Sequence, residues 1–326
     1  MTHKLRKLGL LFLSLVLVLG TVLSLNISNV KAADQSNNGN AKLVIGTLKN
    51  TSAMPLIMAD SSGAFSKNNI TAEVKVYNSN KELNQAVKDG SINFATTDLV
   101  NYAAVSKSNK DWKVMGTLPG YHGLVANKKY SKVKNLKGKT IAIDKRDSSK
   151  QYLKAVLKKN KLKYSSIKVK QIDSDSDRVS ALNDKKVAAA VVEDPYISQA
   201  KGTGSKILNR QKMNADNGNV MITNKKFANS NTSSTNILVD VVNDEISKIN
   251  KMGYAAATPA LQKFEITDEK SAKYITDLDV SFKKMHRVKK SDFNKAFKYA
   301  KAQKLYKGKI SYKKSFLKVK EITNKK

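Results

Sequence analysis

The chain has 326 residues, a formal net charge of +34 and no cysteine. Without cysteine it has no disulfide framework, no cysteine zinc site and no cysteine that could carry a lipid anchor. Only five of the 60 basic residues are arginine, the side chain preferred for bidentate phosphate clamps and for reading bases, so the charge does not indicate a nucleic-acid partner. The lysine excess reflects either retention at an anionic cell wall or membrane surface, or a solvated surface with no binding role.

Residues 1–32 have the pattern of a signal peptide, with a basic start, an apolar run over residues 8–25 and a small-residue site that ends at Ala32. Cleavage near Ala32 is the expected outcome, although the apolar run, about 27 Å long as a helix, could also stay as an uncleaved N-terminal anchor. Residues 33–40 read as a flexible leader. We therefore predict a secreted protein that is retained at the outer face of the cell envelope and is not a lipoprotein.

The first ordered part alternates short apolar runs with polar caps and helices. Strands are predicted over residues 43–48, 72–77, 92–96 and 112–117. Each of the first three is followed by a helix that begins at a turn or cap: Met54-Pro55, Asn78-Ser79-Asn80 and Thr97-Asp98. This order is typical of an α/β lobe.

A second α/β unit follows the break at Leu118-Pro119-Gly120. Its predicted strands cover residues 121–127, 167–171 and 188–192, and residues 135–143 form a tight glycine-lysine turn that leads into a short strand. Residues 218–223 form the returning strand. The caps Asp147-Ser148-Ser149 and the sharp end at Glu193-Asp194-Pro195-Tyr196 place strand ends and helix N-termini on one edge of a parallel sheet. Open α/β sheets bind ligands at that edge.

Helices dominate the last part of the chain, with predicted spans over residues 237–257, 269–278 and 291–302. The simplest architecture is α/β with two lobes: residues 41–118 and 224–326 in the first, and residues 119–223 in the second. A hinge is expected at the two crossings, near residues 118–121 and 220–223.

The loops that follow the strands line the expected cleft between the lobes. Their N-terminal amides and helix dipoles favour an anionic or acceptor-bearing group. For each serine, asparagine and threonine, ordinary helix capping without ligand contact is an equal alternative. The candidate ligand-binding residues are Asn50, Thr51, Ser52, Ser79, Asn80, Thr97, Asp98, Tyr121, His122, Ser148, Ser149, Glu193, Asp194 and Tyr196.

Asp98 and Glu193 are the most specific of these candidates. A carboxylate at a strand end in a partly dry cleft requires a partner such as an amine, a guanidinium or a ring N–H. Either these side chains recognise such a group on a ligand, or they cap the next helix and pair with nearby lysines. Helix N-termini together with carboxylates favour a ligand with both acceptors and donors over a simple oxyanion.

Enzyme motifs are weak in this chain, so we predict a protein that is not an enzyme and has no cofactor or metal. Outside the signal segment the sequence has only two histidines, His122 and His286, and no Gly-x-Ser-x-Gly elbow. Gly138-Lys139-Thr140 imitates the end of a phosphate-binding loop, but Val133 stands where the first glycine is required.

The chain contains a series of short motifs, which are named at the end of this paragraph. Their order and spacing resemble the nitrate/sulfonate/taurine and thiamine-precursor (NMT1/THI5-like) group of ABC-transporter substrate-binding proteins. The similarity extends over residues 42–316. Two departures are the missing lipobox cysteine and the acidic-polar Asp147-Ser148-Ser149, where many relatives carry a glycine-serine-threonine cap. The motifs are Gly46-Thr47, Met54-Pro55-Leu56-Ile57-Met58-Ala59, Gly63-Ala64-Phe65, Thr97-Asp98, Leu136-Lys137-Gly138-Lys139-Thr140-Ile141-Ala142, Asp147-Ser148-Ser149 and Glu193-Asp194-Pro195-Tyr196.

The resemblance implies a type II periplasmic-binding-protein fold whose two lobes close on a small molecule. It further implies delivery of a sulfonate, a taurine-like compound or an aminopyrimidine thiamine precursor to an ABC permease in the membrane, by a monomer. The alternative function is a cationic protein of the same fold that binds anionic cell-wall polymers and has no transport role.

Overall fold

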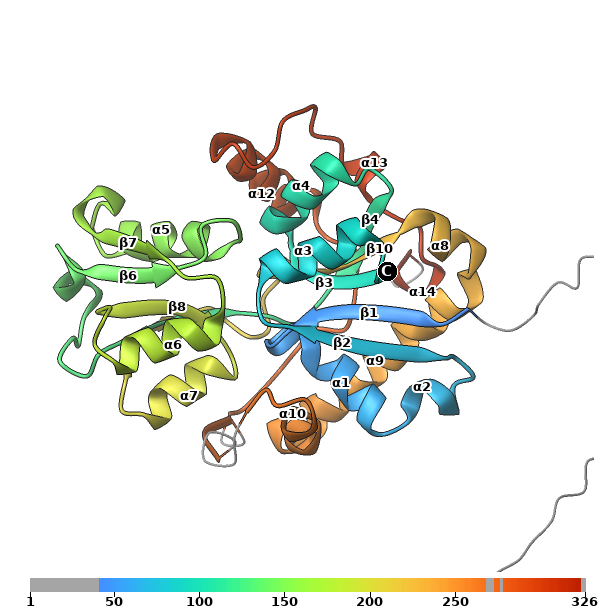
Figure 1. Cartoon of the computed structure of the whole chain (residues 1–326), viewed down its shortest axis with the longest axis horizontal. Coiled ribbons are helices and arrows are strands. Elements are labelled where there is room, and N and C mark those ends of the chain that lie inside the picture. The colour runs from blue at the N-terminus through green and yellow to red at the C-terminus, as the bar shows by residue number, and fades with distance from the viewer. Residues whose placement is uncertain (1–40, 268–272, 276–277, 324–326) are drawn as a thin grey trace, which may run out of the picture. The chain divides into compact units, whose positions relative to one another are not determined.

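Two five-stranded sheets, each with helices packed against it, organise the protein in the computed structural model, which describes residues 41–267, 273–275 and 278–323 (Figure 1). We call the half that carries the first sheet lobe 1 and the other half lobe 2. The first sheet has the order β2 (Ala72–Tyr77), β1 (Leu43–Leu48), β3 (Phe94–Asp98), β10 (Asn219–Asn224) and β4 (Trp112–Thr117). The second has the order β7 (Lys168–Gln171), β6 (Thr140–Ile143), β8 (Ala189–Glu193), β5 (His122–Ala126) and β9 (Lys206–Arg210).

Both sheets are mixed, with a parallel half and an antiparallel half. In lobe 1, β1 pairs in parallel with β2 and β3, whereas β10 is antiparallel to both β3 and β4. In lobe 2, β6 pairs in parallel with β7 and β8, whereas β5 is antiparallel to β8 and β9. The carboxyl ends of the parallel strands in each lobe meet at one edge of the sheet, which is where such sheets bind ligands.

The helices between strands follow from the polar caps that precede them and from the apolar faces that they bury. In lobe 1 these are α1 (Met54–Ser61), α2 (Ala64–Lys67), α3 (Asn80–Asp89) and α4 (Leu99–Ser108). In lobe 2 they are α5 (Ser149–Lys159), α6 (Asp175–Asn183) and α7 (Tyr196–Gly202). The short 3-10 turns are η1 (Thr51–Ala53), η2 (Val133–Leu136), η3 (Tyr164–Ser166) and η4 (Tyr254–Ala257).

The C-terminal part of the chain packs on lobe 1 (Figure 1). Its longest helix contacts α1, and α12 contacts α4. The helices are α8 (Lys225–Ser230), α9 (Thr232–Met252), α10 (Thr258–Lys263), α12 (Lys290–Ala302), α13 (Tyr312–Ser315) and α14 (Lys320–Thr323). One cluster of buried apolar side chains continues from lobe 1 into lobe 2 past Leu118 and Tyr121.

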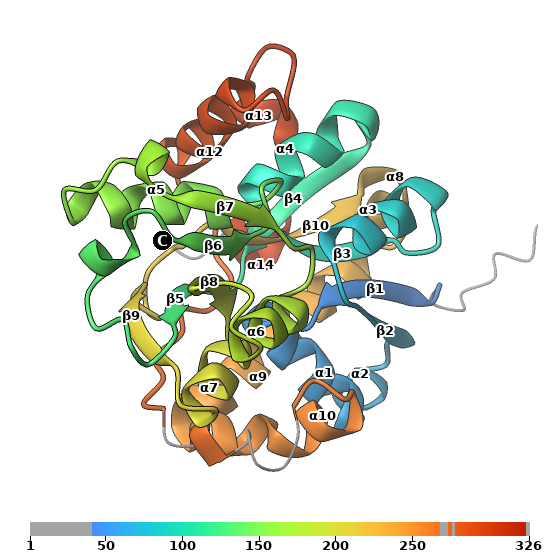
Figure 2. The same cartoon turned by 60° about the vertical axis from the view of Figure 1, so that its left-hand side comes forward.

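Two short segments join the lobes, residues 118–121 between β4 and β5 and residues 211–218 between β9 and β10 (Figure 2). They run side by side, since the amide of Leu118 donates to the carbonyl oxygen of Asn219 at 2.9 Å. A β-carbon on Gly120 would lie 2.0 Å from Asn219 Nδ2, so this close approach requires glycine. The crossing therefore holds Asn219 in a fixed place between the lobes.

The structure confirms the predicted two-lobed α/β class and reproduces several strands to the residue, including residues 43–48, 72–77 and 112–117. Four details were wrong. β10 lies in the lobe 1 sheet, although residues 219–223 were assigned to lobe 2. The predicted strand 92–96 lies at Phe94–Asp98, β9 was not predicted, and the lobe 2 sheet is not purely parallel.

The predicted signal segment, one predicted helix and one predicted hinge segment are compared with the described residues in turn. The signal segment and leader at residues 1–40 lie outside the described residues, as does most of the predicted helix 269–278. The second predicted hinge segment, residues 220–223, is inside β10, and the crossing itself is formed by residues 211–218. No helix in the described ranges is long and apolar enough to cross a membrane.

We expect Phe297→Ala to lower the free energy of unfolding by about 3 to 5 kcal/mol, because it removes a buried ring. Phe297 is 1% exposed, stacks on Phe293 with ring centroids 4.1 Å apart and contacts Tyr102 edge-on at 5.9 Å. Urea unfolding measures the change. The exposed neighbour Lys298 is the matched control, and Lys298→Ala should change stability by less than about 0.5 kcal/mol. A loss below 1 kcal/mol for Phe297→Ala would contradict this packing.

Candidate functional site

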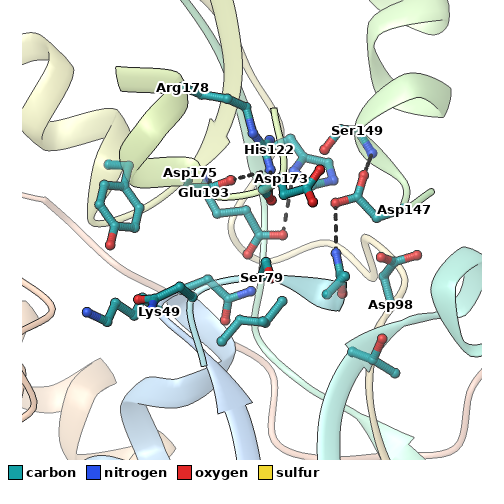
Figure 3. Close-up of a pocket in the computed structure, with 16 residues that line it drawn as sticks. Lys49, Ser79, Asp98, His122, Asp147, Ser149, Asp173, Asp175, Arg178 and Glu193 are labelled. Carbon is teal, nitrogen blue, oxygen red and sulfur yellow. Dashed lines mark hydrogen bonds and ion pairs between the residues drawn. The ribbon is translucent and has the colours of Figure 1, made fainter. Parts of the chain in front are cut away.

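A cavity lies where the carboxyl ends of the strands from both lobes face each other (Figure 3). The enclosed volume is small, about 40 Å³, in this arrangement of the lobes. Lobe 1 contributes the ends of β1, β2 and β3, and lobe 2 contributes the residues that follow β6, β7 and β8. The position is the one that the order of strands and caps predicts.

Five carboxyl groups line this cavity in a chain that is otherwise strongly basic. Two of them have cationic partners: Asp173 pairs with Arg146 at 2.8 Å, and Asp175 pairs with Arg178 at 2.8 Å. Within the described ranges, no ion pair joins the other three to a lysine or arginine. These three, which we call the carboxyl triad, are Asp98, Asp147 and Glu193.

Asp98, the last residue of β3, is the lobe 1 member of the carboxyl triad. Its Oδ1 atom caps α4 by accepting hydrogen bonds from the amides of Val100 at 2.7 Å and Asn101 at 3.1 Å. Burial nevertheless raises the pKa of Asp98 to about 6, because the cavity removes water from the carboxylate. The cap orients the side chain without neutralising it.

Asp147 lies opposite, at the start of α5 in lobe 2. It accepts hydrogen bonds from the Ser149 amide at 2.8 Å and, across the cleft, from Asn80 Nδ2 at 3.2 Å. Burial raises the pKa of Asp147 well above its ordinary value, and repulsion from Asp144 and Asp98 raises it further. Both of these donors are neutral, so a ligand with a positive charge or further N–H donors would stabilise this carboxylate.

Glu193, at the end of β8, completes the triad. Its two oxygens face Asn219 Nδ2 at 3.3 and 3.4 Å, and burial together with Asp175 raises its pKa well above the usual range. His122 Nδ1 lies 3.5 Å from Glu193 Oε1, but burial lowers the pKa of His122 to about 3, so the ring is neutral and the pair is not an ion pair. His122 Nε2 instead shares a hydrogen bond with Ser148 Oγ at 2.8 Å.

Four buried polar atoms on side chains that line the cavity have no hydrogen-bond partner among the described residues. Buried polar groups in folded proteins are nearly always paired, so atoms of this kind indicate where a ligand binds. They include at least one donor and one acceptor, since a guanidinium nitrogen donates and an amide oxygen accepts. The atoms are Asn80 Oδ1, His122 Nδ1, Ser149 Oγ and Arg178 Nε.

The structure brings most of the predicted ligand-binding residues to this cavity. Nine of them line it: Asn50, Ser79, Asn80, Thr97, Asp98, His122, Ser149, Glu193 and Tyr196. Ser148 lines a second hollow of about 820 Å³ between α4, α5 and α12, which adjoins the first at Asp98 and His122.

Four predicted residues lie elsewhere, and the reason is that they hold the lobes together. Thr51 donates to the carbonyl oxygen of Asp194 at 3.3 Å, and Ser52 donates to that of Pro119 at 2.7 Å. The Tyr121 hydroxyl donates to the Asp194 carboxylate, which also accepts from the amide and hydroxyl of Ser198. These buried side chains are paired within the protein, and the structure does not place them in the lining of the cavity.

Sequence reasoning missed several lining residues, chiefly Asp147, Asp173, Asp175 and Arg178. The strand-end rule could have found Asp173 and Asp175, because they follow the strand that ends at Gln171. Arg178 carries no such signal. It lies one turn into α6, and only the fold shows that its guanidinium donates to the Val191 carbonyl beneath the cavity.

Comparisons with known proteins agree with this architecture. The family model described as "NMT1/THI5 like" matches residues 50–248. Among solved structures, the periplasmic aliphatic sulphonate binding protein SsuA from Escherichia coli superposes with a TM-score of 0.70 at 16% identity, over 84% of this chain and 97% of that one. No sequence among the curated proteins matches.

Two further structures show the same fold. A ligand-binding component of an ABC-type import system from Staphylococcus aureus, with zinc bound, gives a TM-score of 0.72 at 16% identity, over 87% of this chain and 98% of that one. The alkanesulfonate-binding protein SsuA from Xanthomonas axonopodis pv. citri, bound to MOPS, gives 0.69 at 17% identity, over 82% and 95%. All three named structures are binding proteins. In the described part of this chain, no group of three or more His, Asp or Glu residues could hold a metal ion.

We expect Asp98→Asn to become more stable relative to the unsubstituted protein as the pH rises from 4 to 7.5. Asparagine keeps the capping oxygen but removes the titrating charge. Because burial raises the pKa of Asp98 from 3.8 to about 6, the stability that its protonation contributes is complete below pH 4 and is lost as the pH rises through 6. The relative gain should be roughly 1 to 3 kcal/mol.

Urea unfolding of the ligand-free proteins at the two pH values measures this gain. The control is Asp184→Asn, which removes the same charge from an exposed site that pairs with Lys186. An identical stability difference for Asp98→Asn at pH 4 and pH 7.5 would contradict a buried, titrating carboxyl group at this position.

Proposed function

This chain belongs to the NMT1/THI5-like family, and from that membership we propose that it is the solute-binding protein of an ABC importer for a donor-rich organic molecule. The observation that supports the ligand class is the carboxyl triad, Asp98, Asp147 and Glu193, which has no cationic partner in the described residues. Buried carboxylates are stabilised by N–H donors or positive charge on whatever binds beside them.

An aminopyrimidine of the thiamine-precursor type fits this lining. Its amino group supplies donors for the carboxyl triad, and its ring nitrogens can accept from a donor such as Arg178 Nε or take up a proton. The neutral ring of His122 packs against Tyr152 with centroids 5.5 Å apart, so one flank of the site is aromatic.

A sulfonate fits less well, although two of the similar structures are named as sulfonate-binding proteins. The anion would face three carboxyl groups, and the main cation, Arg178, is already engaged by Asp175 and by the Val191 carbonyl. A taurine-like compound could direct its ammonium group at the carboxyl triad, but its sulfonate would meet the remaining carboxyl groups, with Lys49, whose Nζ donates to the Glu265 carbonyl oxygen at 3.4 Å, as the other cation of the lining. Among the predicted ligand classes, the aminopyrimidine is therefore the one we propose.

Ligand binding would favour the closed arrangement of the lobes. Asp98 belongs to lobe 1, whereas Asp147 and Glu193 belong to lobe 2, so a ligand that contacts all three bridges the cleft. A ligand shifts a conformational equilibrium only through contacts that differ between the two states. The two crossings, residues 118–121 and 211–218, would serve as the hinge.

The partners and location complete the proposal. We propose that the protein acts as a monomer at the outer face of the cell envelope, after export by its N-terminal signal, and that a membrane permease takes up the ligand. The competing function is a cationic wall-binding protein without transport, and a protein of that kind would show no affinity for small molecules.

The test is a thermal-shift and calorimetry panel with an aminopyrimidine thiamine precursor, taurine, an alkanesulfonate and nitrate. The aminopyrimidine should raise the melting temperature of the protein, because only the native state binds it. Glu193→Gln should weaken its Kd at least tenfold, which corresponds to about 1.4 kcal/mol. Asp184→Asn, which removes the same charge from an exposed site, should leave the Kd within twofold.

Two results would overturn this assignment. If no compound in the panel raises the melting temperature, the transport function loses its support. If taurine or the sulfonate binds and Glu193→Gln leaves that affinity unchanged, the family function stands but the carboxyl triad does not recognise the ligand.

A further inference from the structure

A further hollow, separate from the ligand cavity and from the hollow beside Ser148, lies on lobe 1, and all the charged side chains that line it are lysines. It encloses about 1070 Å³, including its open mouth, and is formed by the end of α4, the start of β4 and residues 306–315. No aspartate or glutamate is among its lining residues. We call it the lysine groove, after Lys107, Lys110, Lys113, Lys307, Lys309 and Lys314.

The lysines of the groove are not engaged in ion pairs. Across the described residues, no ion pair includes any of the six, and all except the half-buried Lys113 are exposed. The adjacent acidic residue, Asp111, faces Lys226 at 3.5 Å. Burial lowers the pKa of Lys113, and repulsion from Lys225 lowers it further. The groove therefore concentrates positive charge that the protein does not neutralise.

Hydrogen bonds fix the walls of the groove. The Tyr102 hydroxyl on α4 lies 3.1 Å from each of the carbonyl oxygens of Trp112 and Ser315 and shares its one hydrogen between them, so it joins all three segments. The amide of Leu317 donates to the Val114 carbonyl at 2.9 Å, which anchors the chain after α13 beside β4. Figures 1 and 2 both show α13 next to α4 and the start of β4. These hydrogen bonds thus hold the lysine groove in a defined shape on lobe 1.

The groove and the ligand cavity lie at opposite edges of the lobe 1 sheet. Trp112, the first residue of β4, lines the groove, and Thr117, the last, is next to the crossing into lobe 2. A strand of this length spans about 17 to 20 Å. A molecule in the groove would leave the mouth of the cavity open.

We propose that the lysine groove binds a linear polyanion that carries a negative charge on each repeat unit. Single exposed lysines hold an anion weakly, each by up to about 1 kcal/mol, but several along one groove act together on a connected chain of charges. A groove is also the shape that an extended polymer requires. The binding would retain the exported protein in an anionic envelope layer while leaving it free to take up ligand.

Two other kinds of anionic surface fit the groove less well. A bilayer surface is flat and gains from apolar insertion, but the exposed large apolar side chains of the described residues, Ile207 and Met252, are not in the groove. Recognition of nucleic-acid bases relies on arginine forks, and no arginine lines the groove. The charge and shape together therefore favour a polymer with simple, regularly spaced charges.

The test compares two variants that each lose five positive charges. The groove variant carries Lys107→Gln, Lys110→Gln, Lys307→Gln, Lys309→Gln and Lys314→Gln. The control variant carries Lys128→Gln, Lys132→Gln, Lys134→Gln, Lys158→Gln and Lys168→Gln, all at exposed positions on lobe 2. The probe is fluorescent long-chain inorganic polyphosphate, and its binding to the full-length purified protein is followed by anisotropy at several salt concentrations.

The groove variant should bind polyphosphate at least tenfold more weakly than the unsubstituted protein, and the control variant no more than threefold more weakly. Urea unfolding should show both variants within about 0.5 kcal/mol of the parent, because the substituted side chains are exposed. Equal losses in the two variants would overturn the proposal in favour of a net-charge effect. So would tighter binding of the parent to phosphatidylglycerol vesicles than to the polymer.

Discussion

The burial of three carboxyl groups that have no cationic partner among the described residues is the constraint around which the candidate site is organised. Asp98, Asp147 and Glu193 are each held by neutral donors: amides at the start of α4 and α5, and the side chains of Asn80 and Asn219. Neutral donors fix the direction of a carboxyl group but do not cancel its charge, so burial, together with repulsion from neighbouring carboxylates, raises all three pKa values. The free-energy cost of burying these carboxyl groups falls when a molecule brings N–H donors or a proton to the cavity.

The same groups connect recognition to lobe closure. Asn80 of lobe 1 donates to Asp147 of lobe 2, and Asn219, held beside Gly120 at the crossing, reaches both Ser52 and Glu193. Asp147 and Glu193, which line the cavity, therefore also take part in contacts between the lobes. Because a ligand acts on the equilibrium only through differential contacts, its hydrogen bonds to these residues would change lobe closure directly.

Much of the fold and of the site could be predicted because backbone periodicity is local. The strands over residues 43–48 and 112–117, and the caps Ser79 and Asp98, follow from alternating apolar residues and from single polar side chains. β9 was missed because Lys206–Arg210 is an edge strand with only two apolar residues, stabilised by pairing with β5. Tyr121 and Asp194 stand at strand ends as required, but the apolar packing between the lobes buries them away from the cavity, which no local pattern reveals.

The protein is strongly basic, whereas its cavity is lined by carboxyl groups, and this difference narrows the charge that a ligand can carry. With a net charge of +34, the protein repels a permanently cationic molecule at low ionic strength, and salt at 0.1 M screens that repulsion only beyond about 10 Å. A molecule that is neutral in water and gains a proton inside the site avoids this repulsion. Burial raises the pKa of Asp147 and of Glu193 well above the ordinary range, so these groups hold a proton more tightly than exposed carboxyl groups do, and such a proton can pass to a basic ring nitrogen and leave a carboxylate partner. An aminopyrimidine has a nitrogen of this kind, whereas a sulfonate or nitrate offers no basic atom. The positive surface therefore disfavours a ligand with a permanent positive charge, and the carboxyl triad disfavours an oxyanion. Together they favour a neutral, weakly basic ring.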